Sequence, residues 1–275
     1  MVMLLKSSHD TTTAAKPYFV MVDDAKIDGH EQLYRWRWHA PRLSRSPKTK
    51  QPLNEGTLHD FVIDGRGNID SPFRIYDPQL ERTKTEITFL APADFDFEIS
   101  QFSPEGTIDH RLLEVKHKSV DPVYMAILFP RKSGFERPAI VPLMVHGDGA
   151  AGGVIHWDQQ LEDTLLTGRG EEISAANMKT NARLACVRTL AGDVVEYALG
   201  EGNQLSFKTQ SLVADVQGSG SISLAVHELV LTGNITSGRF WAPRIERVMM
   251  NEQSVTFTRE GPYVRLLDSL PQARD

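Results

Sequence analysis

The chain has 275 residues, of which 40% are hydrophobic and 24% charged, the composition of a globular protein with a buried core. Its net charge of −6 and pI near 5.9 disfavour nucleic acid as a partner, because proteins that bind nucleic acid usually carry an excess of basic residues. No apolar run is long enough for a transmembrane helix and the apolar start is too short for a secretory signal, so we expect a soluble protein without a membrane partner.

The first half of the chain has the period-two alternation of β-strands. The N-terminal residues 1–5 read as a strand that pairs across a loop with residues 18–23. Further strands are predicted over residues 33–39, 86–90, 94–99, 112–116 and 123–129. Between them, the segment from about 41 to 56 holds three prolines and no apolar periodicity, which predicts a long exposed loop.

The second half continues the same pattern. Strands are predicted over residues 139–145, 183–189, 194–199, 222–226, 228–232, 248–251, 254–258 and 263–267. Only residues 158–166 and 171–179 have a pattern that allows a turn or two of helix. Short strands separated by turn residues are typical of a sandwich. We therefore predict an all-β fold, a large antiparallel two-sheet β-sandwich with very little helix, and a single domain over residues 1–275.

The segment 33–39 carries the strongest functional signal. On a strand, Tyr34, Trp36 and Trp38 lie on one face, and Arg35, Arg37 and His39 on the other. Two guanidinium groups about 7 Å apart suit carboxylates, which arginine binds in bidentate fashion. Either the aromatic residues are core and the arginines a solvated face, or the strand binds an anionic ligand.

Three motifs resemble the β module of heparinase II/III-like polysaccharide lyases. They are Pro17-Tyr-Phe-Val-Met-Val-Asp-Asp24 followed by Tyr34-x-Trp36-x-Trp38-His39, the Ala-Ile-Leu-Phe-Pro-Arg segment at 126–131, and residues 251–264. The resemblance implies the β-sandwich portion of such a lyase, acting on or binding a uronic-acid polysaccharide or oligosaccharide by β-elimination. It also implies a bacterial periplasmic or secreted protein.

The resemblance carries specific expectations for site residues. By motif position it implies a structural Zn²⁺ ion held by Asp23 and His39, with His9 as the nearest further histidine. The strand itself offers Tyr34 and His39 as candidate catalytic residues, and Arg35, Arg37, Trp36 and Trp38 as candidate substrate contacts. His39 cannot serve as both base and ligand. The α-helical toroid that supplies much of the cleft in this family has no counterpart in the sequence, so a toroid domain or partner chain is an expected partner.

Two alternatives remain open. The chain is a non-catalytic carbohydrate-binding or structural module, or it is a compact lyase in which Tyr124 or Tyr197 lies near His39.

Several weaker features have ordinary structural interpretations. The pattern Gly147-x-Gly149-x-x-Gly152 precedes a strand rather than a helix, which indicates a hairpin loop and not a nucleotide site. Core or loop roles are expected for the remaining candidates, which are Cys186, His146, Asp148, His156, Asp158, Trp157 and Trp241.

Overall fold

The structure, a computed structural model, describes residues 1–5, 15–41, 62–64, 68–73, 83–102, 110–132, 138–225 and 227–266. Within these ranges the chain is all β, with no helix, and its strand pairs are antiparallel except for one parallel pair. The predicted all-β fold class is therefore confirmed. The two segments that allowed short helices instead hold strands β12 (Leu161–Thr167), β13 (Ile173–Ala175) and β14 (Met178–Thr180).

The chain divides into two compact units where the sequence predicts one domain. The first unit comprises Met1–Lys6 and Pro17–Arg137, and the second comprises Ser7–Lys16 and Pro138–Asp275. Each unit has two sheets of its own. Of the loop predicted over about 41–56, Pro41 is the last residue of a strand and the rest lies outside the described residues.

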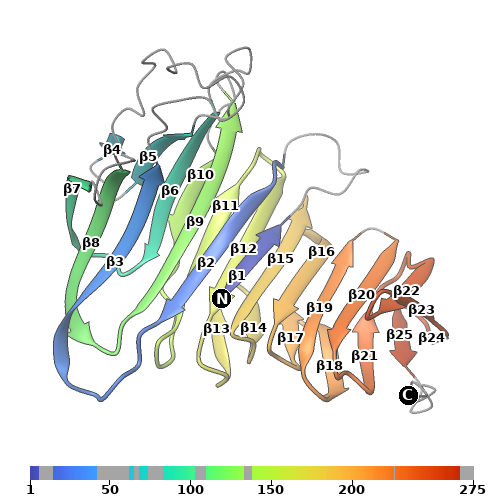
Figure 1. Ribbon diagram of the computed structural model, residues 1–275. Helices are drawn as coiled ribbons and strands as arrows, with labels where there is room; N and C mark the ends of the chain where they lie inside the picture. Colours follow the sequence, from blue (N-terminus) through green and yellow to red (C-terminus); the bar gives the residue numbers. More distant parts are fainter. Residues whose placement is uncertain are drawn as a thin grey trace. The chain divides into compact units, whose positions relative to one another are not determined.

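The first unit contains a six-stranded and a three-stranded sheet (Figure 1). Sheet I has the order β1 (Val2–Leu5), β2 (Tyr18–Asp24), β9 (Val123–Lys132), β6 (Thr83–Ala91), β5 (Asn68–Phe73), β4 (Val62–Asp64). Sheet II has the order β3 (Glu31–Pro41), β8 (His110–Val120), β7 (Asp96–Phe102). The predicted pairing of the N-terminal strand is confirmed, since Val2 lies opposite Met21 and Leu5 opposite Tyr18.

The core of the first unit comes from alternate residues of both sheets. Sheet II contributes Tyr34 and Trp36 from β3 with Leu113 and Val115 from β8. Sheet I contributes Ile87, Phe89, Tyr124, Ala126 and Leu128. The rings of Trp36 and Phe89 meet edge to face with centroids 5.0 Å apart, a favoured aromatic geometry. Burial of this face fixes the register of β3, because a shift of one residue would turn the arginines into the core.

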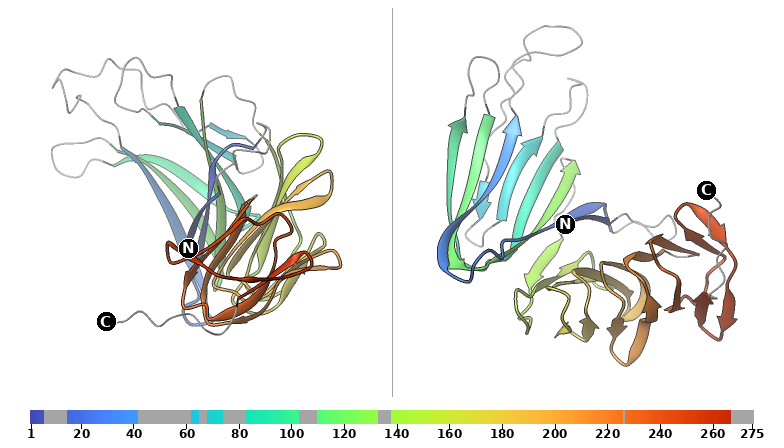
Figure 2. Two further views of the ribbon diagram at one scale, coloured as in Figure 1. Left: turned by 90° about the vertical axis from the view of Figure 1, so that its right-hand side faces the viewer. Right: turned by 60° about the horizontal axis from the view of Figure 1, so that its bottom comes forward.

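The second unit is built from hairpins that alternate between two sheets (Figure 2). Sheet III has nine strands in the order β10 (Ala139–Pro142), β11 (Ala151–His156), β12, β15 (Leu184–Leu190), β16 (Asp193–Gly200), β19 (Gly220–Ala225), β20 (Glu228–Gly233), β22 (Arg247–Met250), β23 (Gln253–Val255). Sheet IV has seven in the order β13, β14, β17 (Leu205–Phe207), β18 (Gln210–Gln217), β21 (Ser237–Trp241), β25 (Tyr263–Leu266), β24 (Thr258–Glu260). Strands β20 and β22 form the parallel pair.

An apolar core fills the space between sheets III and IV. It includes Leu166, Val187 and Leu199 from sheet III, and Leu212 and Phe240 from sheet IV. The glycine-rich segment that begins at Gly147 leads from β10 into β11, which pair antiparallel. The interpretation of this segment as a hairpin connection is confirmed.

Sheet III also carries a buried ion cluster. Arg188 on β15 donates to both oxygens of Asp163 on β12, at 2.6 and 2.8 Å. It also donates to Oε2 of Glu196 on β16, at 2.8 Å. Trp157 Nε1 donates to Asp163 Oδ2 at 2.9 Å. These four side chains therefore form one hydrogen-bonded cluster, in which Glu196 Oε1 is buried without a hydrogen-bond partner in the described structure. Cys186, on the strand of Arg188, is buried as predicted.

Candidate functional site

Strand β3 separates its aromatic and basic side chains onto opposite faces of sheet II. Tyr34 and Trp36 are 8% and 7% exposed and belong to the core, and Trp38 is half-buried beside them. The side chains of Arg35 and Arg37 are 46% and 53% exposed on the opposite face. This placement follows from the two-residue period of a strand whose aromatic side is buried.

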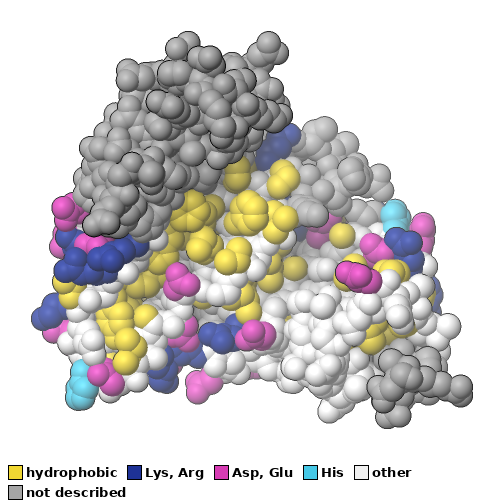
Figure 3. All heavy atoms as spheres, viewed as in Figure 1, with side chains coloured by type: hydrophobic (Ala, Val, Ile, Leu, Met, Phe, Trp, Pro, Cys, Tyr) yellow, Lys and Arg dark blue, Asp and Glu magenta, His cyan; other side chains and the backbone are white. Residues whose placement is uncertain are grey.

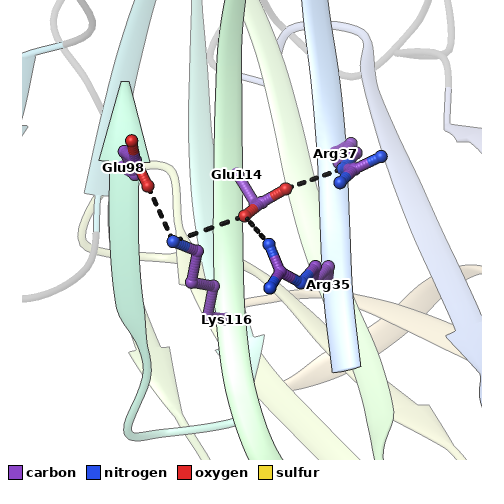
Figure 4. Close-up of polar contacts among 5 residues, drawn as sticks. All are labelled: Arg35, Arg37, Glu98, Glu114 and Lys116. Carbon is purple, nitrogen blue, oxygen red and sulfur yellow. Dashed lines mark hydrogen bonds and ion pairs between the residues drawn. The ribbon is translucent and has the colours of Figure 1, made fainter. Parts of the chain in front are cut away.

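One carboxylate anchors both arginines (Figure 4). Arg35 Nη1 donates to Glu114 Oε1 and Arg37 Nε donates to Glu114 Oε2, each at 2.7 Å. Glu114 lies on β8 directly opposite Arg37, which places its carboxylate within reach of the arginine two residues away. The Glu114 side chain is only 9% exposed. The two guanidinium groups are thus tied to a rigid point of the sheet.

The network extends across β8 to β7 through Lys116 (Figure 4). Its Nζ lies 2.7 Å from Glu98 Oε2 and 3.4 Å from Glu114 Oε1. The hydrogen bond from Arg37, with smaller contributions from Lys116 and Arg35, lowers the pKa of Glu114 below its usual 4.5. The hydrogen bond to Glu98 raises the pKa of Lys116 above 10.5. Both shifts favour the ionised forms of Glu114 and Lys116.

Basic and acidic side chains are interspersed over the exposed face of sheet II (Figure 3). Beyond the five-residue network, Lys118 Nζ pairs with Glu31 Oε2, and both side chains are exposed. Such a face produces little long-range field, so it would recognise an anion by local hydrogen bonds. A guanidinium has five N–H donors. Within the described residues Arg35 and Arg37 each donate one side-chain hydrogen bond, to Glu114, which leaves donors for a ligand.

The buried side of β3 is structural in character. Trp36 Nε1 donates to Asp23 Oδ2 at 2.9 Å, and the ring of Trp36 stacks on that of Trp38 with centroids 6.1 Å apart. A ring buried between Phe89 and Trp38 has no open face for a sugar. The expected substrate contact by Trp36 therefore lacks an accessible surface.

The expected zinc ligands are only partly described. Asp23 is the hydrogen-bond partner of Trp36. The backbone of His39 lies in β3, but its side chain and all of His9 lie outside the described residues. Among the side chains that the structure does describe, no group of three or more His, Cys, Asp or Glu is placed to hold a metal ion.

Tyr34, the expected catalytic tyrosine, faces Tyr124 of sheet I in the core of the first unit. Both hydroxyl groups are buried and have no hydrogen-bond partner within the described structure. Burial, together with the nearby Tyr34, raises the pKa of Tyr124 to about 12. A general base must be deprotonated near the working pH. This environment opposes that role for Tyr124.

The remaining candidates each have a structural partner. Tyr197, in the second unit, is buried, which raises its pKa, and its hydroxyl donates to Trp241 O at 3.1 Å. Asp148 accepts from Arg169, and His156 Nδ1 lies 2.8 Å from Glu162 Oε1. Asp158 accepts from two backbone N–H groups of its own turn. None of these contacts brings Asp148, His156 and Asp158 together at one point.

Sequence reasoning missed Glu98, Glu114 and Lys116 as members of the site. The strand 112–116 was predicted, and its Glu114-x-Lys116 spacing places both charges on one face. That alternation was the available signal. The pairing of Arg37 with Glu114 is not accessible from it, because the two residues are 77 positions apart.

Comparison with models of known protein families and with curated proteins finds no match for this chain. In the described ranges, no helix has the length and apolar character needed to cross a membrane.

Proposed function

We propose that this chain binds a uronic-acid-containing polysaccharide or oligosaccharide through the exposed face of sheet II, as the β-sandwich portion of a heparinase II/III-like lyase. The observation that carries the proposal is the pair of exposed arginines, Arg35 and Arg37, tied to the nearly buried carboxylate of Glu114. A repeating uronate chain presents carboxylates along its length, which suits adjacent guanidinium groups.

Anchoring by Glu114 supports binding in two ways. It holds both arginines in defined positions, so less side-chain entropy is lost when a ligand binds. It also fixes one edge of each guanidinium and leaves other N–H donors for the ligand. Because Glu114 neutralises part of the charge, we expect modest affinity that depends on the geometry of the carboxylates more than on total charge.

The first unit favours binding without turnover by the chain alone. β-Elimination requires a base, a group that neutralises the uronate carboxylate, and exclusion of water. Arg35 and Arg37 fit the neutralising role, whereas Tyr34 lies on the buried side of the same strand. We propose that a toroid domain or partner chain supplies the base and the second wall of the cleft.

The test combines binding with turnover. The purified chain is titrated calorimetrically with polygalacturonate, alginate and hyaluronan, and the ultraviolet absorbance of the unsaturated product is followed in parallel. We expect binding of at least one polymer and no rise in absorbance. The Arg35→Ala/Arg37→Ala variant should lose binding.

The matched control is Arg183→Ala/Arg247→Ala, which removes the same charge from two exposed ion pairs of the second unit. Equal loss in both variants would contradict a specific role for sheet II. A rise in absorbance would show that the chain is a lyase by itself and would refute binding without turnover.

A further inference from the structure

A second basic surface lies on sheet IV of the second unit, where β21 pairs with β25. In this register Arg239 lies directly opposite Arg265, and Trp241 opposite Tyr263. The intervening residues Phe240 and Val264 are fully buried in the core. By strand alternation Arg239, Tyr263 and Arg265 share the face of sheet IV that points away from that core, whereas Trp241 packs partly against the core. We call Arg239, Tyr263 and Arg265 the arginine–aromatic patch.

The two arginines of the patch form a like-charged pair. Like charges directly opposite each other destabilise a sheet. In sheet II the two arginines lie on one strand, two residues apart, and Glu114 bonds to both. In the patch each arginine has a separate carboxylate: Asp215 Oδ2 lies 3.8 Å from Arg239 Nε, and Glu260 Oε1 lies 3.2 Å from Arg265 Nε. Within the described residues, no single carboxylate forms an ion pair with both guanidinium groups.

Arg239 is oriented by an aromatic ring, but one of its N–H donors has no hydrogen-bond partner in the described structure. Its Cζ lies 4.9 Å from the centre of the Tyr263 ring, a cation–π contact that orients the guanidinium. Its Nε is buried and has no hydrogen-bond partner in the described structure, since Asp215 is beyond hydrogen-bond distance. The side chains of Arg239 and Arg265 remain 36% and 49% exposed. An oriented, accessible guanidinium beside a second one is a receptor for a carboxylate.

The strands that flank the patch leave room above it. Ala214 on β18 lies opposite Arg239, and Thr258 on β24 lies opposite Arg265. Both side chains are short, so nothing large from these positions covers the guanidinium groups.

We infer that the arginine–aromatic patch is a second binding subsite for an acidic glycan, in which Arg239 and Arg265 together bind the carboxylate of one uronate residue. The ligand class rests on the proposed function; the site itself rests on the patch. Placing a carboxylate between the two arginines offsets their mutual repulsion and offers acceptor oxygens to the exposed part of each guanidinium.

The test uses the full chain with polygalacturonate as probe, dextran as neutral control and dextran sulfate as sulfated control. The Arg239→Ala/Arg265→Ala variant should bind polygalacturonate about tenfold more weakly or worse, as expected when two charge-assisted hydrogen bonds are lost. Arg239→Lys/Arg265→Lys keeps the charge but removes the planar guanidinium, and should also weaken binding. Arg183→Ala/Arg247→Ala is again the matched control.

A measurement on the unmodified protein makes the test independent of folding in the variants. Phenylglyoxal labels exposed arginines, and mass spectrometry of the labelled chain should show that polygalacturonate protects Arg239 and Arg265 but not Arg247. Absence of protection at the two patch arginines would overturn the subsite. Full affinity in the lysine variant would show diffuse charge attraction and would overturn it as well.

The outcomes separate this inference from the proposed function. Loss of binding in Arg35→Ala/Arg37→Ala but not in Arg239→Ala/Arg265→Ala would leave the proposed function standing and remove the subsite. The reverse result would place binding on sheet IV and remove sheet II. Binding of dextran sulfate alone would overturn recognition of a carboxylate, and absence of binding to all polymers would overturn both proposals.

Discussion

Replacing Arg188 by alanine should be among the most damaging single substitutions in the second unit. Arg188, Asp163 and Glu196 are 3%, 0% and 8% exposed. The substitution removes three charge-assisted hydrogen bonds of 2.6–2.8 Å and leaves two buried carboxylates without their shared cation. Removing one partner of a buried ion pair costs about 3–5 kcal/mol. We expect a loss of about 4 kcal/mol, because Trp157 still donates to Asp163.

The assay is urea unfolding followed by far-ultraviolet circular dichroism, with the transition of the second unit fitted separately. The control is Arg247→Ala, whose guanidinium lies 2.6 Å from Glu228 but whose side chain is 61% exposed. Exposed ion pairs contribute about 0–1 kcal/mol. The Arg188–Asp163 and Arg247–Glu228 ion pairs are therefore similar in length and differ in burial. A loss below about 1 kcal/mol for Arg188→Ala would refute the reasoning that burial of the uncompensated carboxylates sets the cost.

Three further predictions concern Glu114, the buried tyrosines of the two units, and Asp23. Glu114→Gln should weaken the dependence of the free energy of unfolding on pH at acid pH. Arg37 lowers the pKa of the Glu114 carboxyl in the folded state, so this carboxyl stabilises the fold above its unfolded pKa and loses that contribution as pH falls through the lower folded pKa. Urea midpoints measured below pH 4.5 test this. Tyr124→Phe should be neutral or stabilising by up to about 1 kcal/mol, since the buried Tyr124 hydroxyl has no partner in the described structure. Tyr197→Phe should cost about 1 kcal/mol, because it removes the hydrogen bond to the backbone carbonyl of Trp241. Thermal melts that rank the two variants the other way would contradict this assignment. Asp23→Ala should lower the free energy of unfolding by about 1–3 kcal/mol, because it leaves the part-buried Trp36 N–H unpaired. An equal effect of Asp23→Ala in the Trp36→Phe background would show that this hydrogen bond is not the cause.

Much of the first unit could be predicted from the sequence because its exposed strands alternate. β3 is the clearest example, since Arg35 and Arg37 alternate with aromatic residues that pack in the core. β12 was missed because nearly every residue in it is buried, including Asp163, so no period-two pattern remains. Strands β13, β14 and β17 have three residues each, too few for a pattern to show.

The division into two units and the composition of the site depend on contacts distant in sequence. β9 and β10 are separated by only a few residues, from Lys132 to Ala139, as in an ordinary loop, so no linker composition marks the boundary. The anchor Glu114 becomes visible only once β3 and β8 are paired. The side chain of His39 lies outside the described residues, and its expected roles stay predictions.

The two units also differ in how far the chain must travel to form them. In the first unit β2 pairs with β9, so that Phe19 meets Leu128, and β3 pairs with β8, so that Glu31 meets Val120. In the second unit no described register pair is farther apart in sequence than Leu161 and Leu190. Loop closure slows the formation of distant pairs. We therefore expect the second unit to form rapidly by adding hairpins one after another, while the face that carries Arg35 and Arg37 assembles slowly and only after β8 has been synthesised.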